Sequence, residues 1–167
     1  MEHLIAVIGY SDSGKTTLVT ALVAEFKRRG YRVGTVKHTC HAPSFDKSGK
    51  DSWRHFDAGA DTSMIYSDSI FAFVKRRAES GEADGGIHGL GQYFEDVDLV
   101  IAEGFKSAAC PKIEVCRTGD RERLLYRRLP GVIAVVSPDD GNFSVPRFDW
   151  DCVPELAAML EKKVLGK

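Results

Sequence analysis

The sequence predicts an α/β fold, in which a mostly parallel sheet is flanked by helices and carries an inserted β-hairpin. Short, continuous apolar runs alternate with amphipathic helical patterns along most of the 167 residues. A glycine-rich turn joins the first apolar run to the first helical pattern, as in strand–turn–helix units. Two adjacent apolar runs around a polar pair give a hairpin signal.

The bulk composition is that of one globular domain spanning residues 1–167. Hydrophobic residues make up 43% of the chain and the net charge is −1, so no global field favours nucleic acid or an anionic membrane. The apolar run at 4–8 is too short to span a bilayer and has no basic stretch before it. We therefore expect a cytoplasmic protein without a nucleic-acid or membrane partner. The four cysteines lack C-x-x-C spacing and are expected to be reduced.

The first elements form a βαβ unit. A strand over residues 4–8 leads into the turn, and a helical pattern of apolar residues follows and stops at Gly30. A second strand covers 32–37. Strand, helix and strand within about 35 residues imply a parallel sheet with a right-handed crossover.

The remaining elements follow in order. A short helix is expected over 51–59, closed by Gly59, and a hairpin occupies about 62–76, with strands at 62–67 and 70–75. A short helix near 88–96 precedes three strands at 98–104, 112–116 and 132–137, and an amphipathic helix over 154–165 closes the chain.

The turn at residues 9–17 reads Gly-Tyr-Ser-Asp-Ser-Gly-Lys-Thr-Thr, which is G-x-x-x-x-G-K-[ST] between a strand and a helix. Such a turn, a Walker A or P-loop sequence, points backbone N–H groups at a phosphate beside the positive end of the helix. Lys15 is placed to reach the β- and γ-phosphates, and the Thr16 hydroxyl to ligate Mg²⁺. The predicted nucleotide-binding residues of this P-loop NTPase-like fold are Gly9, Ser11, Asp12, Ser13, Gly14, Lys15, Thr16 and Thr17.

The strand at 98–104 is an apolar run that ends in an acid, the pattern of a Walker B element. A carboxylate at that strand end can hold the Mg²⁺ shell or orient a water molecule. We assign this role to Glu103 rather than Asp98, which lies at the opposite end of the run. Glu103 and Lys15 are the predicted catalytic residues.

The polar stretch after the second strand carries two further candidate sites. His38, Cys40 and His41 lie close enough in sequence to share a metal ion, but they lack a complete four-ligand spacing. Lys37, Lys47, Lys50 and Arg54 concentrate positive charge there, to which Lys106 can add. That excess indicates either a second anion site or a solvated surface.

The base of the nucleotide stays open on the motif alone. The guanine-reading sequence N/T-K-x-D is absent from the chain. Residues 137–140, Ser-Pro-Asp-Asp, follow the last strand, where Asp139 can accept hydrogen bonds from guanine N1 and N2. The same four residues also suit an ordinary turn.

The chain resembles the MobB family, the GTP-binding adapter proteins of molybdenum-cofactor biosynthesis. The phosphate loop alone is unspecific, whereas two further blocks make the resemblance specific: Gly-Lys-Asp-Ser-Trp-Arg-His at 49–55 and Glu-Gly-Phe-Lys at 103–106. The resemblance extends to Val36-Lys37-His38 with His41, to Asp46 and Ala58-Gly59-Ala60, and to Pro111-Lys112-Ile113-Glu114-Val115.

The resemblance implies GTP and Mg²⁺ as ligands and weak GTPase activity at most. It also implies a homodimer formed partly through the hairpin, working beside the molybdopterin guanylyltransferase that makes molybdopterin guanine dinucleotide. Carried over to this chain, the metal site falls on Thr16 and Glu103 with Asp51 or Asp46. Lys50 and Arg54 then become candidates for a second anion, such as the phosphate of molybdopterin.

Two other functions compete with this reading. A small-molecule kinase using ATP needs an arginine-rich lid, for which the candidates are Arg76, Arg77, Arg121, Arg123, Arg127 and Arg128, although the last four also suit a solvated face. A metallochaperone GTPase is motivated by His38, Cys40 and His41.

Overall fold

The computed structural model describes residues 3–39, 46–76, 86–117 and 123–167. By its contacts the chain divides into two compact units. The first unit combines residues 1–38 with 84–167, and the second is the segment 39–83 inserted between them. Each unit is described below by itself.

The first unit is built on a six-stranded sheet in the order β2-β5-β1-β6-β7-β8, and every neighbouring pair is parallel. Its strands are β1 (Leu4–Gly9), β2 (Val33–Lys37), β5 (Leu99–Glu103), β6 (Lys112–Val115), β7 (Val132–Val136) and β8 (Arg147–Phe148). Its helices are α1 (Lys15–Arg28), α3 (Val153–Leu160), the 3-10 helices η1 (Gly86–Tyr93) and η3 (Leu125–Arg127), and the π-helix η4 (Glu161–Leu165). None of the helices in the described ranges has the length and apolar character needed to cross a membrane.

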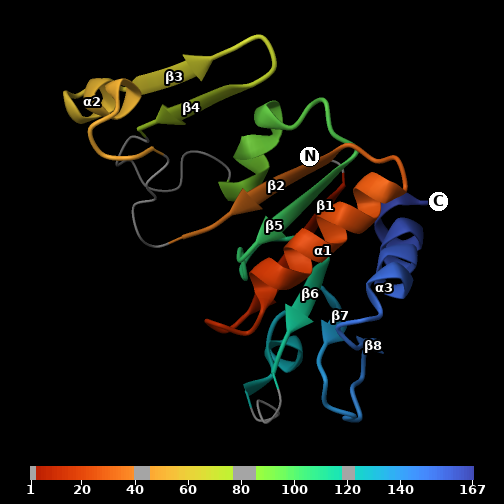
Figure 1. The fold of residues 1–167 in the computed structure, drawn as a ribbon. Helices are drawn as coiled ribbons and strands as arrows, with labels where there is room; N and C mark the ends of the chain where they lie inside the picture. The colour runs from red at the N-terminus through yellow and green to blue at the C-terminus, as the bar shows by residue number, and fades with distance from the viewer. Residues whose placement is uncertain (1–2, 40–45, 77–85, 118–122) are drawn as a thin grey trace. The chain divides into compact units, whose positions relative to one another are not determined.

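Alternate residues of the strands point to two separate cores. Ile5, Val7 and Ile101 face the helices α1 and α3, which bring Leu22, Phe26 and Leu160 to the same cluster; Figure 1 shows both helices along one face of the sheet. The opposite face carries Leu4, Ala6 and Val100, covered by Ile87 of η1 and by Leu125. Burial on both faces explains why these strands read as continuous apolar runs.

The predicted fold class is confirmed, with a six-stranded parallel sheet, flanking helices and a separate antiparallel hairpin. The structure adds three details to the prediction. The expected helix near 88–96 is the 3-10 helix at 86–93, whose three glycines disfavour an α-helix. The C-terminal α-helix ends at Leu160 and continues as one π-turn. The two-residue strand β8 and the helix η3 were missed, because elements this short carry no periodic signal.

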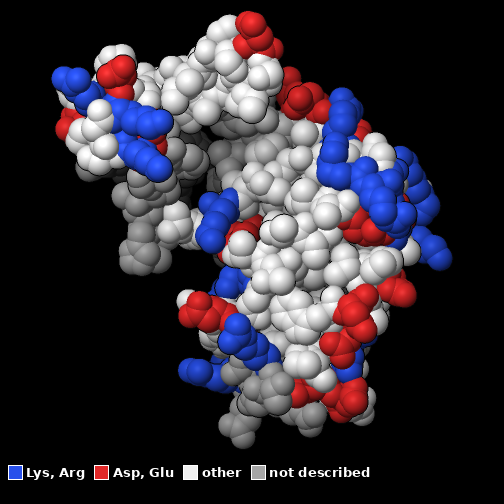
Figure 2. Space-filling view, viewed as in Figure 1, with Lys and Arg blue, Asp and Glu red and all other residues white. Residues whose placement is uncertain are grey.

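The second unit contains α2 (Asp51–Asp57) and the hairpin of β3 (Thr62–Tyr66) and β4 (Phe71–Lys75), which pairs Met64 with Phe73. Arg76 ties the hairpin to α2, because it donates to the carbonyl oxygen of Phe56 at 2.7 Å and lies 4.2 Å from that residue's ring centroid. The far end of the hairpin exposes large apolar side chains, and Figure 2 shows a mostly white surface there with an acidic group at its tip. These side chains are Met64, Ile65, Tyr66, Ile70 and Phe71.

A buried carboxylate in α1 gives the first unit an acid-sensitive contact. Glu25 accepts hydrogen bonds from Arg28 at 2.7 and 2.8 Å and from Arg29 at 2.7 Å, and Arg29 also pairs with Glu161 of η4. Hydrogen bonding from Arg28, and then from Arg29, lowers the Glu25 pKa to about 2. A carboxylate whose pKa is lowered by folding stabilises the folded state at pH values above its ordinary pKa. This stabilisation is lost as the pH falls through about 2.

We therefore expect Glu25→Gln to lower the melting temperature at pH 7 and to make little difference near pH 2. Thermal unfolding followed by circular dichroism between pH 2 and 7 measures this. Glu155→Gln, at an exposed position of α3, is the matched control. A melting-temperature difference for Glu25→Gln that stays constant over the whole pH range would contradict the assignment.

Candidate phosphate-binding site

The candidate site lies where the parallel strands of the first unit end. The carboxyl ends of β2, β5 and β1 are adjacent, since Lys37 pairs with Glu103 and Val7 pairs with the same residue. The glycine-rich loop leaves the end of β1 and enters α1 at Lys15. Ligands of open α/β sheets bind at this edge, where strand order reverses about β1.

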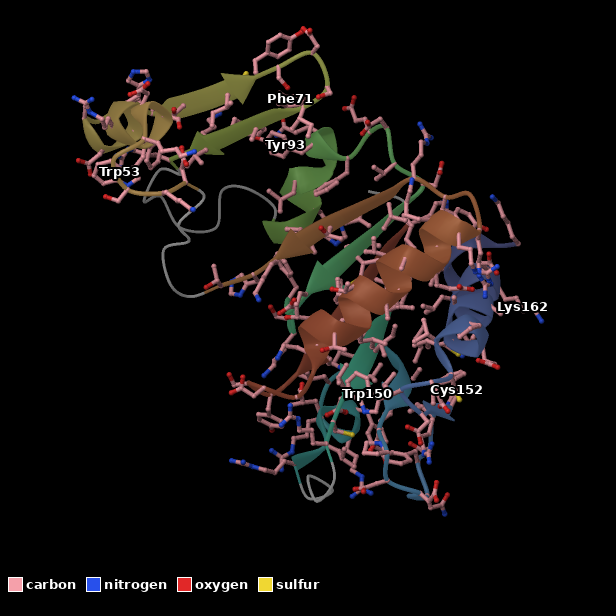
Figure 3. All side chains as sticks on the ribbon, viewed as in Figure 1. Trp53, Phe71, Tyr93, Trp150, Cys152 and Lys162 are labelled. Atoms are coloured by element: carbon pink, nitrogen blue, oxygen red, sulfur yellow. The ribbon has the colours of Figure 1, made fainter. Side chains whose placement is uncertain are left out.

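The glycines of the loop are required by its geometry. Gly14 has φ +99°, and a Cβ there would lie 2.5 Å from an indole carbon of Trp150. A Cβ at Gly9 would lie 2.5 Å from the carbonyl oxygen of Val115. Trp150 follows β8 and lies beside the start of α1, as Figure 3 shows. The loop is therefore packed closely against β6 and Trp150, with no room for side chains at the two glycines.

Ser13 carries an orphaned polar atom inside the loop. Its side chain is 3% exposed, and its hydroxyl oxygen has no hydrogen-bond partner among the described residues. An unpaired buried hydroxyl costs on the order of 1–3 kcal/mol. The hydroxyl lies against Gly9, where a Cβ would be 2.6 Å from its oxygen.

The ammonium group of Lys15 lies folded over its own loop, where Nζ donates to the carbonyl oxygen of Tyr10 at 2.5 Å. Burial lowers the Lys15 pKa; the charge of Glu103 opposes this effect, whereas Lys106 and Lys37 add to it. Lys15 is thus a cation crowded by other cations, which an anionic ligand would relieve.

Thr16 and Glu103 provide hard oxygen ligands at one point. The Thr16 hydroxyl donates to both carboxylate oxygens of Glu103, at 2.9 and 3.1 Å. Lys37 Nζ lies 3.0 Å from the same carboxylate, which is 8% exposed as a residue. A hydroxyl and a carboxylate beside a phosphate loop are the donor set that Mg²⁺ prefers, so these residues fit the ion.

Asp98 lies at the opposite end of β5, as its sequence position indicated. It accepts from the Arg32 side chain at 2.9 Å and from the Arg32 backbone N–H at 2.7 Å. Hydrogen bonding from Arg32 lowers its pKa to about 2. Asp98 is therefore a partner of Arg32 and lies away from Thr16.

Asp139 lies on the loop after β7, at the carboxyl edge and two strands from β1. Its backbone N–H donates to the Ser137 hydroxyl at 3.2 Å, and Arg147 donates to its carbonyl oxygen at 2.9 Å. Arg147 also pairs with Asp140. These bonds fix the loop that was predicted to contact the base.

The other predicted residues fall into three groups. Lys50, Asp51 and Arg54 belong to the second unit, where Asp51 opens α2. Cys40, His41, Arg77 and Arg121 lie outside the described residues. Among the residues that are described, no three His, Cys, Asp or Glu side chains form a metal-binding group. Of the arginines considered for a kinase lid, Arg76 is bound within the second unit and Arg127 covers Tyr126.

Sequence reasoning missed the buried carboxylate of Glu114 on β6. Glu114 is 1% exposed and accepts from the backbone N–H groups of Leu125 at 2.7 Å and Tyr126 at 2.8 Å. Lys112, two residues earlier, is 2% exposed and donates to the carbonyl oxygen of Pro130 at 2.9 Å. The sequence did carry a signal for this contact, namely two charged residues within an otherwise apolar strand. Charged side chains are rarely buried unless they are paired, so such residues indicate a buried polar contact.

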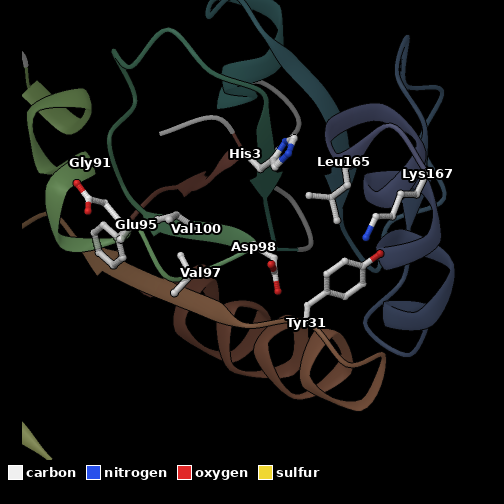
Figure 4. A pocket seen from close by; sticks show the side chains of 10 residues that line it. His3, Tyr31, Gly91, Glu95, Val97, Asp98, Val100, Leu165 and Lys167 are labelled. Atoms are coloured by element: carbon white, nitrogen blue, oxygen red, sulfur yellow. The ribbon is translucent and has the colours of Figure 1, made fainter.

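A second hollow lies at the amino edge of the sheet, opposite the phosphate loop. It has a volume of about 480 Å³ and is lined by side chains that include His3, Asp98 and Lys167 (Figure 4). Two of its polar groups are used within the protein: His3 bonds the carbonyl oxygen of Val164 at 2.9 Å, and Lys167 lies over Tyr31.

Comparison with known proteins matches the chain along most of its length. The family model described as molybdopterin guanine dinucleotide synthesis protein B, MobB, matches residues 4–138. The molybdopterin-guanine dinucleotide biosynthesis adapter protein of Haemophilus influenzae is 39% identical, over 95% of this chain and 87% of that protein. The protein of the same name from Escherichia coli is 34% identical, over 94% and 90%. A MobB homologue from Bacillus stearothermophilus, solved by crystallography, superposes with a TM-score of 0.71 at 26% identity, covering 98% and 99% of the two chains.

Proposed function

The chain belongs to the MobB family, that of molybdopterin guanine dinucleotide synthesis protein B, and from this premise we propose that it is a GTP-binding adapter. It acts in molybdopterin guanine dinucleotide biosynthesis, the process that its curated relatives are named for. The observation that carries the nucleotide part of the proposal is the bond between Thr16 and Glu103 beside the glycine-rich loop.

Different residues of the loop bind different parts of the nucleotide. Backbone N–H groups between Ser11 and Thr17 bind the phosphates. Lys15 leaves the Tyr10 carbonyl oxygen and neutralises the β- and γ-phosphates. Thr16 and Glu103 would hold Mg²⁺, which would supply charge neutralisation for the phosphates.

Intrinsic hydrolysis is expected to be slow, because no glutamine lies at this edge to position a water molecule. The chain has one glutamine, Gln92, and it lies in η1, beside Gly91 at the opposite hollow. Hydrolysis of a γ-phosphate depends mainly on orienting the attacking water and neutralising charge. The proposed role is therefore nucleotide-dependent assembly with a partner, rather than rapid turnover.

The proposed partners are a molybdopterin guanylyltransferase, molybdopterin itself and a second copy of this chain, all in the cytoplasm. Arg54 of α2 and Lys50 at its N-cap stay the candidates for a second anion. The exposed apolar end of the hairpin supports a homodimer, because contiguous exposed apolar side chains commonly mark interfaces.

Replacing Glu103 by glutamine should weaken binding of GTP in the presence of Mg²⁺ about tenfold, since one charged ligand of the ion is lost. Binding in EDTA should be unchanged or tighter, because Lys37 loses its carboxylate partner and adds positive charge. Calorimetric titration with and without Mg²⁺ measures both effects. Asp98→Asn, at the other end of β5, is the matched control, and an equal loss with and without Mg²⁺ would refute the metal assignment.

The adapter role is tested by reconstitution. Purified guanylyltransferase, molybdopterin, GTP and Mg²⁺ are combined with and without this chain, and formation of molybdopterin guanine dinucleotide is followed by chromatography. The proposal predicts faster formation with the wild-type chain and none of that gain with Lys15→Ala. An equal rate in all three reactions, without a complex between the two proteins, would refute it.

A further inference from the structure

Two cations share the aromatic ring of Tyr10, the first residue of the loop after Gly9. Lys106 Nζ lies 4.9 Å from the ring centroid, and the Arg123 guanidinium carbon lies 5.3 Å from it. Lys106 comes from the segment after β5, and Arg123 from the segment before η3. Two segments distant in sequence thus bring positive charge to the start of the phosphate loop.

The ring positions these cations without neutralising them. Within the described ranges neither Lys106 nor Arg123 has an ion pair with a carboxylate. A cation over an aromatic face is held by about 0.5–1 kcal/mol at an exposed site. Because the ring carries no net charge, the cation stays able to pair with an anion. Lys106 acts on Lys15, whose pKa it helps to lower after the larger effect of burial.

Both cations belong to segments with fixed backbones. After Glu103, Gly104 and Phe105 adopt φ of +93° and +53°, and the Phe105 ring packs on His38 with centroids 5.2 Å apart. The chain following Arg123 is held by the buried carboxylate of Glu114, which accepts from two consecutive backbone N–H groups at 125 and 126. The residues beside Lys106 and just after Arg123 are therefore held by contacts of the fold.

Positive charge outnumbers negative charge beside the phosphate loop. Lys15, Lys37, Lys106 and Arg123 gather there, and Glu103 and Asp12 are the carboxylates acting on Lys15. Glu103 is already shared between Thr16 and Lys37. A nucleoside triphosphate carries more negative charge than a diphosphate, and its additional phosphate lies beyond the two that the loop backbone surrounds.

We propose that Lys106 and Arg123, positioned by the Tyr10 ring, bind the terminal phosphate of the nucleoside triphosphate and so distinguish triphosphate from diphosphate. This inference rests on the proposed function and deepens it. It gives the adapter a means of responding to the state of its nucleotide. The two side chains are binding residues for that phosphate, and Tyr10 is a positioning residue.

The test compares the affinities of GTP and GDP, each with Mg²⁺, by calorimetric titration. The wild-type chain is expected to prefer GTP. Lys106→Ala and Arg123→Ala should each reduce the GTP-to-GDP affinity ratio about tenfold while leaving GDP affinity within about threefold. Tyr10→Leu keeps both charges and removes the ring, so it should reduce the ratio by a smaller factor. Lys106→Arg keeps the positive charge and should therefore retain the wild-type ratio.

Arg127→Ala is the matched control, because that guanidinium lies 5.6 Å from the ring centroid of Tyr126 instead. An equal loss of GTP and GDP affinity in the Lys106 and Arg123 variants would overturn the inference, as would an unchanged ratio. Inorganic phosphate binding to the GTP-loaded wild type, and lost in both variants, would assign the two cations to a separate ligand and also overturn it. A wild-type chain that binds neither nucleotide would overturn the proposed function as well.

Discussion

Lys15→Ala is expected to lower the affinity for GTP with Mg²⁺ by at least about 100-fold, since contacts from a charged donor are worth about 1.5–3 kcal/mol each. In the free protein its ammonium group bonds the Tyr10 carbonyl oxygen at 2.5 Å and is crowded by Lys37 and Lys106. Phosphates relieve that repulsion, and alanine removes the group that spans them. Calorimetric titration measures the loss.

Lys27→Ala in the last turn of α1 is the control for this experiment, because it removes the same charge from an exposed position of the same helix. Its affinity should equal that of the wild type. Retained micromolar binding by Lys15→Ala would refute the placement of the phosphates on this loop. Both variants should unfold at the wild-type temperature, which separates binding from stability.

Glu114→Ala is expected to lower the free energy of unfolding by about 3 kcal/mol. The substitution leaves the backbone N–H groups of Leu125 and Tyr126 without their acceptor, at a position that is 1% exposed. Urea unfolding followed by circular dichroism measures the change.

Two controls make the Glu114 result specific. Glu114→Gln keeps an acceptor oxygen in the same place, so it should cost less than the alanine variant. Glu155→Ala, on the exposed side of α3, should change the free energy of unfolding by less than about 0.5 kcal/mol. An alanine variant of Glu114 as stable as the wild type would show that the segment at 123–127 is held by other contacts.

The sheet and α1 could be predicted because their signals are local. Strands buried on both faces, such as β1 and β5, must be continuous apolar runs, and the loop before α1 has a fixed glycine spacing. The position of Glu103 beside Thr16 followed from the rule that parallel strands end at one edge. The hairpin followed from two apolar runs around residues 68–69.

The contacts that complete the site could not be predicted, because they join residues far apart in sequence. Nothing near Trp150 indicates that its indole fills the space beside Gly14. The sequence pattern suggested that Arg123 belongs to a solvated face. In the structure its guanidinium group lies over the Tyr10 ring. The roles given to Asp51 and Asp139 came from a resemblance and from the position of a loop, and they stay predictions.

The measurement that tests the central claim most directly is calorimetric titration of the purified chain with GTP and then with ATP, both with Mg²⁺. The account predicts binding of GTP at least roughly tenfold tighter than ATP, a gap of ~1.4 kcal/mol, and it attributes the preference to the loop at Asp139. Equal binding of the two nucleotides, or tighter binding of ATP, would contradict a GTP-binding adapter and favour a kinase that uses ATP.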